Sequence, residues 1–218
     1  MRRVVVLALL ATALALPIAA WADDIGITNQ FGSISVSSAG VSTVGSELLT
    51  FGSFAAAAGH SLGEIYYSTG GLTGGTLSAG GTFSTAGSAF DVIGHGAWAK
   101  SLPGWSHGTI TLFSGSFVSS GPLGQPTPLT WTLLSKVGQN LTYSLSGEVY
   151  GMLYTGRDVY GTTTQDFHTT VKGLAAGKGY GILGYTTLNT VPEPGTLGLL
   201  GAGLVGIAGL FRRKLIGS

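Results

Sequence analysis

The nine residues Leu141-Thr142-Tyr143-Ser144-Leu145-Ser146-Gly147-Glu148-Val149 decide the fold class of this chain. Leu, Tyr, Leu and Val fall on one side of an extended backbone, and Thr, Ser, Ser and Glu fall on the other. A period of two is typical of a strand with one buried and one solvated face, and it does not fit a helix. The same alternation occurs at residues 33–37, 109–112, 130–133 and 166–172.

Turn signals separate these strands. Glycine pairs stand at 70–71, 74–75 and 80–81, and a Gly- and Pro-rich segment stands at 121–126. Short strands with frequent turns predict an all-β fold, with residues 23–190 forming a single antiparallel β-sandwich or jelly-roll-like domain.

Two local patterns leave alternatives to this fold open. Residues 74–79 are nearly repeated at 80–85, which would suit a β-solenoid coil, although two copies are few for a solenoid. Residues 48–58 are the only stretch of the body with some helical capacity.

Composition excludes several classes of protein. The chain has 218 residues, 38 of them Gly, no Cys, and 10 Lys+Arg against 9 Asp+Glu. Half of the basic residues lie near the two ends, so residues 23–190 hold five basic and eight acidic residues, a net charge of −3. Without a basic face the body is not expected to bind nucleic acid. Without Cys there is no disulfide, thiolate metal site or cysteine nucleophile.

The first 22 residues have the form of a secretory signal peptide. Arg2-Arg3 precedes the apolar run Val4–Leu16, which is followed by the small-residue site Ala20-Trp21-Ala22. As a helix the 13-residue run would span about 20 Å, too short for a bilayer core of about 30 Å. The predicted partners are therefore the Sec machinery and signal peptidase, with cleavage after Ala22 and a mature chain that starts at Asp23. A buried N-terminal helix is the alternative, but the run lacks an amphipathic period.

The last 28 residues, 191–218, contain three unlike elements in a fixed order. Val191-Pro192-Glu193-Pro194-Gly195 precedes the apolar run 196–211, and Arg212-Arg213-Lys214 follows. Sixteen apolar residues give about 24 Å of helix, a marginal transmembrane span in the precursor. The basic triplet is expected to remain cytoplasmic, which places the body on the other side of the membrane.

These residues resemble the PEP-CTERM proteins, whose tails are read by an exosortase. The resemblance makes Pro192, Glu193 and Pro194 the sorting motif and Arg212, Arg213 and Lys214 the basic stop. It implies a Gram-negative cell, an inner-membrane-anchored precursor, and cutting near the motif that releases or re-anchors the body at the cell surface or in the extracellular matrix. The family is associated with exopolysaccharide and biofilm matrix, and its tail is also labelled an ice-binding protein C-terminal domain. A membrane anchor that is never processed is the alternative.

One pattern resembles a catalytic motif. Gly104-Trp105-Ser106-His107-Gly108 has the spacing of a nucleophile elbow, and Asp158 and His168 follow in the chain order of a hydrolase triad. That elbow needs a strand before the serine and a helix after it, whereas Pro103 precedes this motif and β-like residues follow it. We therefore predict a tight glycine turn here.

Other ligand patterns are weak. Residues 179–184 fit Gly-x-Gly-x-x-Gly, but without a following helix they suit a glycine-rich last strand or turn better than a dinucleotide site. The four histidines His60, His95, His107 and His168 are widely spaced, and Asp91 with His95 and His107 is the one grouping that could meet around a metal. We expect loop histidines, no metal and no cofactor.

Surface chemistry offers one further class of ligand. Aromatic rings can stack on sugar rings, and the candidates are Tyr66, Tyr67, Trp98, Trp105, Tyr150, Tyr154 and Tyr160. The same residues could instead pack in the core or across strands. Thr162-Thr163-Thr164 could order water against ice, but the sequence lacks a regular threonine array.

The sequence thus predicts an exported cell-envelope or matrix protein with a structural or exopolysaccharide-associated body and no enzymatic activity. The first alternative is a carbohydrate-binding or adhesin module. The second is a hydrolase, which would require one polar pocket that joins Asp91, His95, Ser106 and His107.

Overall fold

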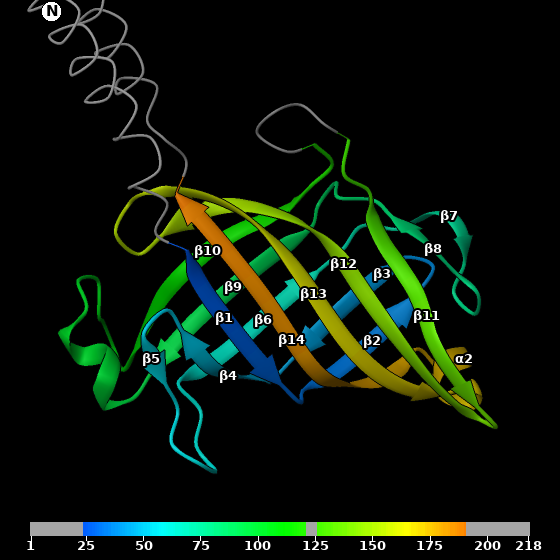
Figure 1. Ribbon diagram of the computed structural model, residues 1–218, viewed down its shortest axis with the longest axis horizontal. Helices are drawn as coiled ribbons and strands as arrows, with labels where there is room; N and C mark the ends of the chain where they lie inside the picture. Colours follow the sequence, from blue (N-terminus) through cyan, green and yellow to red (C-terminus); the bar gives the residue numbers. More distant parts are fainter. Residues whose placement is uncertain (1–23, 121–125, 191–218) are drawn as a thin grey trace, which may run out of the picture.

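The computed structural model describes residues 24–120 and 126–190, most of which lie in antiparallel strands (Figure 1). The strands are β1 (Ile25–Gln30), β2 (Ser33–Ser37), β3 (Gly40–Val44), β4 (Ser46–Phe51), β5 (Phe54–Ala55), β6 (Gly63–Ser68), β7 (Leu72–Thr76), β8 (Gly80–Phe83), β9 (Ala89–His95), β10 (Thr109–Val118), β11 (Leu129–Val137), β12 (Asn140–Leu153), β13 (Asp158–Thr170) and β14 (Lys178–Thr190). Two short helices are η1 (Ala97–Ser101) and α2 (Val171–Ala175). The predicted signal peptide at 1–22 and sorting tail at 191–218 lie outside the described residues.

Eight of these strands close into a barrel. The ring runs β1, β14, β13, β12, β10, β9, β6, β4 and back to β1, and every neighbouring pair is antiparallel. It closes where β1 pairs with β14, with Ile25 opposite Leu188. The all-β prediction is confirmed. The sandwich or jelly roll is not what forms, because the first and last strands pair with each other instead of ending two separate sheets.

The remaining strands lengthen the barrel. β2 and β3 continue β1 and β4 beyond kinks at Phe31-Gly32 and Gly45, and β2 pairs with the start of β14. β11 pairs with the first half of β12, and β10 pairs with the second half. β8 then pairs with β11, and β7 pairs with β8.

Two minor expectations are settled by these strands. The near repeat of 74–79 and 80–85 lies in the antiparallel β7–β8 hairpin. The two copies therefore belong to the two strands of one hairpin and are not stacked coils of a solenoid. Residues 48–58, which had some helical capacity, hold the end of β4 and all of β5. Pairing with β1 and β6 outweighs the local propensity of this stretch.

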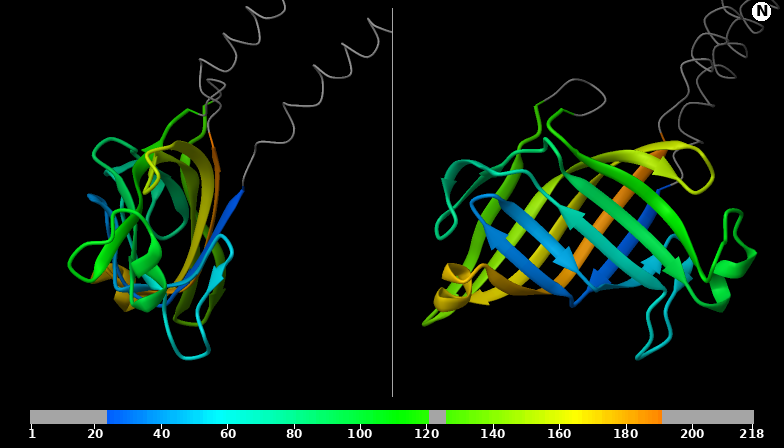
Figure 2. Two further views of the ribbon diagram at one scale, coloured as in Figure 1. Left: turned by 90° about the vertical axis from the view of Figure 1, so that its left-hand side faces the viewer. Right: turned by 180° about the vertical axis from the view of Figure 1, so that it is seen from behind.

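The two ends of the barrel differ. β1 begins and β14 ends side by side at one end, which we call the terminal end, and η1 lies there after β9 (Figures 1 and 2). The other end, the distal end, carries α2 between β13 and β14. Val36 donates its N–H to the Gly177 carbonyl there, and Leu174 of α2 is buried. A shallow hollow beside α2 is lined by residues of β2 and by Leu77.

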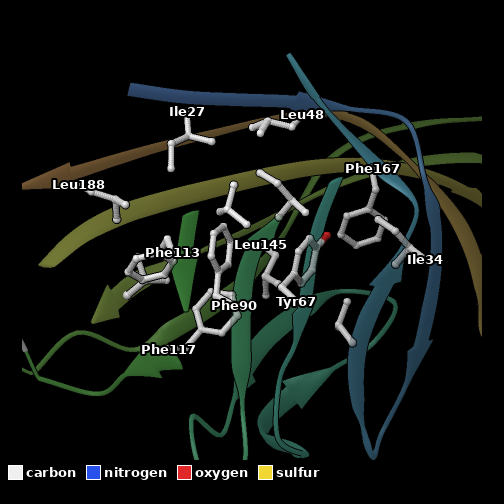
Figure 3. Close-up of a cluster of buried hydrophobic side chains, with 14 of the residues drawn as sticks. Ile27, Ile34, Leu48, Tyr67, Phe90, Phe113, Phe117, Leu145, Phe167 and Leu188 are labelled. Carbon is white, nitrogen blue, oxygen red and sulfur yellow. The ribbon is translucent and has the colours of Figure 1, made fainter. Parts of the chain in front are cut away.

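Aromatic side chains fill the barrel interior (Figure 3). One cluster contains Tyr67, Phe90, Phe113 and Phe117, with ring centroids 5.8–6.4 Å apart. The other centres on Trp131, whose ring lies 4.4 Å from both Tyr143 and Phe167 and 5.8 Å from Phe83.

The β7–β8 turn covers this second cluster. Trp131 donates its indole N–H to the Leu77 carbonyl at 2.9 Å, and Tyr143 donates its hydroxyl to the Ser78 carbonyl at 3.1 Å. Burial of an aromatic side chain contributes about 1.5–3 kcal/mol to stability. In Trp131 and Tyr143 the polar group of the buried side chain is also hydrogen-bonded.

The apolar side chains of residues 141–149 face the barrel interior from β12, as the sequence pattern predicts. Leu141, Tyr143, Leu145 and Val149 are all buried. Gly147 occupies the remaining inward position, where a Cβ would lie 2.6 Å from Leu129 Cδ1, so the packed interior leaves no room for a side chain.

Candidate functional site

The sorting motif begins where the barrel ends. Thr190, the last residue of β14, lies opposite Val159 of β13, and Pro192 follows two residues later in the chain. Pro192, Glu193, Pro194, Arg212, Arg213 and Lys214, like the cleavage residues Ala20, Ala22 and Asp23, lie outside the described residues. A cut beyond Thr190 would leave every strand of the ring intact.

The Gly104–Gly108 motif forms a tight turn, as predicted. Ser106 and Thr109 exchange two backbone hydrogen bonds of 3.1 Å, and His107 and Gly108 between them have positive φ angles of 51° and 92°. β10 follows directly at Thr109, so the strand–turn–helix geometry of a nucleophile elbow is not formed.

The other two residues of the hypothetical triad are far apart. Asp158 and His168 begin and nearly end the same strand, β13. Ten residues of extended backbone separate them by about 33 Å. A triad needs each partner within hydrogen-bond reach of the next, so these side chains do not form one with Ser106.

The other polar candidates do not converge either. Asp91 accepts a hydrogen bond from Ser114 Oγ at 2.7 Å, whereas His95 lies at the far end of β9 opposite Thr109. Within residues 24–120 and 126–190, no three acidic or histidine side chains come together as metal ligands would. His168 instead packs against Tyr180, with ring centroids 5.3 Å apart.

The predicted sugar-stacking residues are mostly not free on the surface. Tyr67 is only 4% exposed and lies in the core, so its prediction as an exposed ring is wrong. Trp98 donates its indole N–H to the Leu62 carbonyl, and its ring is tilted against that of Phe54, with centroids 4.9 Å apart. Tyr66, Trp105, Tyr154 and Tyr160 are half-buried, and Tyr150 is exposed.

The most exposed tyrosines are two that the sequence analysis missed. Tyr180 is 57% exposed and Tyr185 is 55% exposed, both on the outside of β14. The signal was present in the run 179–185, where the Gly-x-Gly-x-x-Gly pattern places glycines on the inner side and larger residues on the outer side. This run is a strand, as the sequence analysis favoured, and no dinucleotide loop forms.

A hydrogen-bonded chain of buried polar side chains explains why residue 184 is a glycine. Asn29 Nδ2 donates to Ser46 Oγ at 2.7 Å and to Gln165 Oε1 at 3.0 Å, and Gln165 Nε2 donates to Thr163 Oγ1 at 2.9 Å. A Cβ on Gly184 would lie 2.1–2.2 Å from Gln165 Oε1 and Asn29 Oδ1. The inner side of β14 is thus closed to a side chain at this position.

Burial also affects the ionisation of the core tyrosines. Burial raises the pKa of Tyr67 well above its ordinary value, and the negative charge of Asp166 adds to the rise. Burial likewise raises the pKa of Tyr143. Above the ordinary tyrosine pKa of about 10, the unfolded chain loses these protons while the folded chain retains them.

The stability that these tyrosines contribute is therefore fully present below about pH 10 and is lost as the pH rises further. We expect the unfolding temperature to fall as the pH rises above about 10, and to fall less steeply in Tyr67→Phe. Circular dichroism melts at each pH measure this difference. Parallel pH profiles for the wild type and the variant would contradict the assignment.

Comparison with known proteins identifies the C-terminal segment. Residues 190–214 match the PEP-CTERM protein-sorting motif. No curated protein and no solved structure matches the chain. The chain therefore carries a PEP-CTERM sorting signal directly after a closed all-β body.

The motif determines how the precursor is handled. It implies a secreted, membrane-anchored precursor and an exosortase as the processing partner. None of the helices in the described part of the chain has the length and apolarity to cross a membrane.

Proposed function

We propose that this chain is a cell-envelope or extracellular-matrix protein of a Gram-negative bacterium, and that its barrel is a non-catalytic body associated with exopolysaccharide. The observation that carries this proposal is the position of the sorting motif relative to the barrel. β14 completes the ring by pairing with both β1 and β13, and it ends at Thr190, where the motif begins. Removal of the tail would therefore release a complete domain.

A structural body also suits the interior of the barrel. Packed aromatic side chains occupy the space in which a small ligand would otherwise sit. Ser106 and Asp91 each bond to their immediate neighbours, and Asp158 and His168 lie near opposite ends of one strand. These positions favour a binding or scaffold role over a hydrolase.

Fractionation of cells that produce the protein tests its association with the matrix. We expect most of the mature protein in the washed extracellular matrix of cells that make exopolysaccharide. In otherwise identical cells unable to make the polysaccharide, we expect it in the free medium. An equal distribution in the two strains would contradict the proposal.

A further inference from the structure

The outer surface around β14 has an unusual composition. The strands β12, β13, β14 and β1 lie side by side in the ring, and β4 follows β1 (Figure 1). We call their outward-facing residues, with those of β2 and β3, the outer wall. Its cross-strand rows are Met152–Asp158, Tyr150–Tyr160–Asn189, Glu148–Thr162–Thr187–Gly26, Ser146–Thr164–Tyr185–Thr28–Thr50, Ser144–Asp166–Leu183–Gln30–Glu47, Thr142–His168–Tyr180–Ser33–Val44, Asn140–Thr170 and Lys178–Ser35–Ser42.

Hydroxyl groups dominate the middle of the outer wall. The hydroxyls of Thr28 and Thr50 are hydrogen-bonded to each other at 2.7 Å, and those of Ser146 and Thr164 are hydrogen-bonded at 3.3 Å. The rows contain one basic side chain, Lys178, and four acidic side chains, Glu47, Glu148, Asp158 and Asp166. Solvated faces of sheets ordinarily carry charges of both signs, which keep them soluble and prevent association. This wall has few charges, and hydroxyls, aromatic rings and the exposed aliphatic side chains of Leu183 and Val44 lie between them.

Three rings project from the outer wall around β14. Tyr180 and Tyr185 project from the outer side of β14. The inner side has no room for a side chain at Gly184, where a Cβ would collide with the side chains of Gln165 and Asn29. Gly181 is closed in the same way, since a Cβ there would lie 2.2 Å from the Phe31 carbonyl oxygen. Phe31 itself is exposed at the β1–β2 kink and has a φ of 58°, a strained backbone for a bulky residue.

We propose that the outer wall is a binding site for an uncharged polysaccharide, with Tyr180 and Tyr185 as its stacking residues. The apolar face of a sugar ring packs on an aromatic face, and the surrounding hydroxyls and amides of Ser, Thr, Gln30 and Asn189 both donate and accept hydrogen bonds. The wall carries four carboxylates, Glu47, Glu148, Asp158 and Asp166, against the one ammonium group of Lys178, so its net negative charge disfavours an acidic polysaccharide. This inference rests on the proposed association with exopolysaccharide and identifies the surface that would make it.

The spacing of the two tyrosines favours a polymer as the ligand. They lie five residues apart on one strand, and the irregular pairing near Ile182 and Leu183 keeps both on the outer side. At the rise of a strand, this separation is about 16 Å. One or two sugar units do not reach from one ring to the other, so a chain gains contacts that a short oligosaccharide lacks.

Affinity electrophoresis in native gels tests the site. The probes are the neutral and acidic fractions of the exopolysaccharide from the producing cells, separated by anion exchange, together with hydroxyethyl cellulose. We expect the neutral fraction to retard the wild-type mature protein. For Tyr180→Ala/Tyr185→Ala we expect at least about tenfold weaker binding, since two stacked rings are lost. Tyr180→Phe/Tyr185→Phe keeps both ring faces and should retain most of the binding.

Ile93→Ala is the matched control, because Ile93 faces outward from β9, which stands opposite β14 in the ring. It should bind as the wild type does, and all variants should melt within a few degrees of it. Wild-type binding by the alanine double variant, or stronger retardation by the acidic fraction, would overturn the site while leaving exopolysaccharide association in place. A wild-type protein that neither polysaccharide fraction retards would overturn both the site and the association.

Discussion

Replacing Pro192, Glu193 and Pro194 together by alanine is expected to leave the protein in the membrane as its uncut precursor. Proline and the residue before it favour extended backbone over helix, which is the form that a protease binds, so we expect the two prolines to favour cutting. Alanine removes that restriction as well as the carboxylate of the motif. We expect the amount of mature protein outside the cell to fall by at least about tenfold. A loss of about 1.4 kcal/mol in the free energy with which the protease binds the motif is enough for this effect.

Immunoblots of membrane, surface and medium fractions measure this change. Pro103→Ala is the control, because it removes a proline in the loop before Gly104 and leaves the motif unchanged. It should be exported like the wild type. Normal release of the triple variant would show that the motif at 190–214 is not what the processing enzyme reads.

Trp131→Ala is expected to remove a large part of the stability of the barrel. The Trp131 side chain is 1% exposed and stacks against Tyr143 and Phe167. Truncation would leave a large cavity and an unpaired Leu77 carbonyl, which together cost about 3–5 kcal/mol. A domain of this size has a total stability of about 5–15 kcal/mol, so we expect the unfolding temperature to fall by about 10 °C or more.

Leu134→Ala on the same strand is the control for this loss. Leu134 is 54% exposed, so its truncation should shift the midpoint by no more than about 2 °C. Thermal melts followed by near-ultraviolet circular dichroism report on the packing of the aromatic rings. Equal midpoints for the two variants would contradict the placement of Trp131 inside the barrel.

The pattern of the sequence predicts which side of each strand faces inward. At 141–149 every apolar residue of the alternation is buried as expected. This works because a period of two sets the side of a strand independently of which strand lies next to it. The turn at Ser106–Thr109 was predictable for a similar reason, since glycine and proline act on the backbone locally.

Ring closure could not be predicted in the same way. It depends on the pairing of β1 with β14, whose residues are separated by most of the body. Short strands with turns are compatible with a sandwich and with a barrel, and local alternation does not distinguish the two. The twist and register of the whole sheet decide which of them forms.

The surface tyrosines were missed because exposure depends on neighbours outside the strand. Tyr67 and Tyr185 look alike in sequence, but Tyr67 lies against Phe90 and Phe117 while Tyr185 lies among Thr28 and Thr164. The glycines at 179, 181 and 184 were the feature of the sequence that indicated which side of this strand holds the large side chains. A strand with glycine on one side must place its large side chains on the other.

An intact barrel is expected to reach the outside of the cell without its C-terminal tail. The most direct measurement is mass spectrometry of both terminal peptides of the protein recovered from the cell surface or medium. We expect a chain that starts at Asp23 and ends between Thr190 and Gly195, with all of β14 present. A recovered chain that retains Arg212, Arg213 and Lys214, or that lacks part of β14, would contradict it.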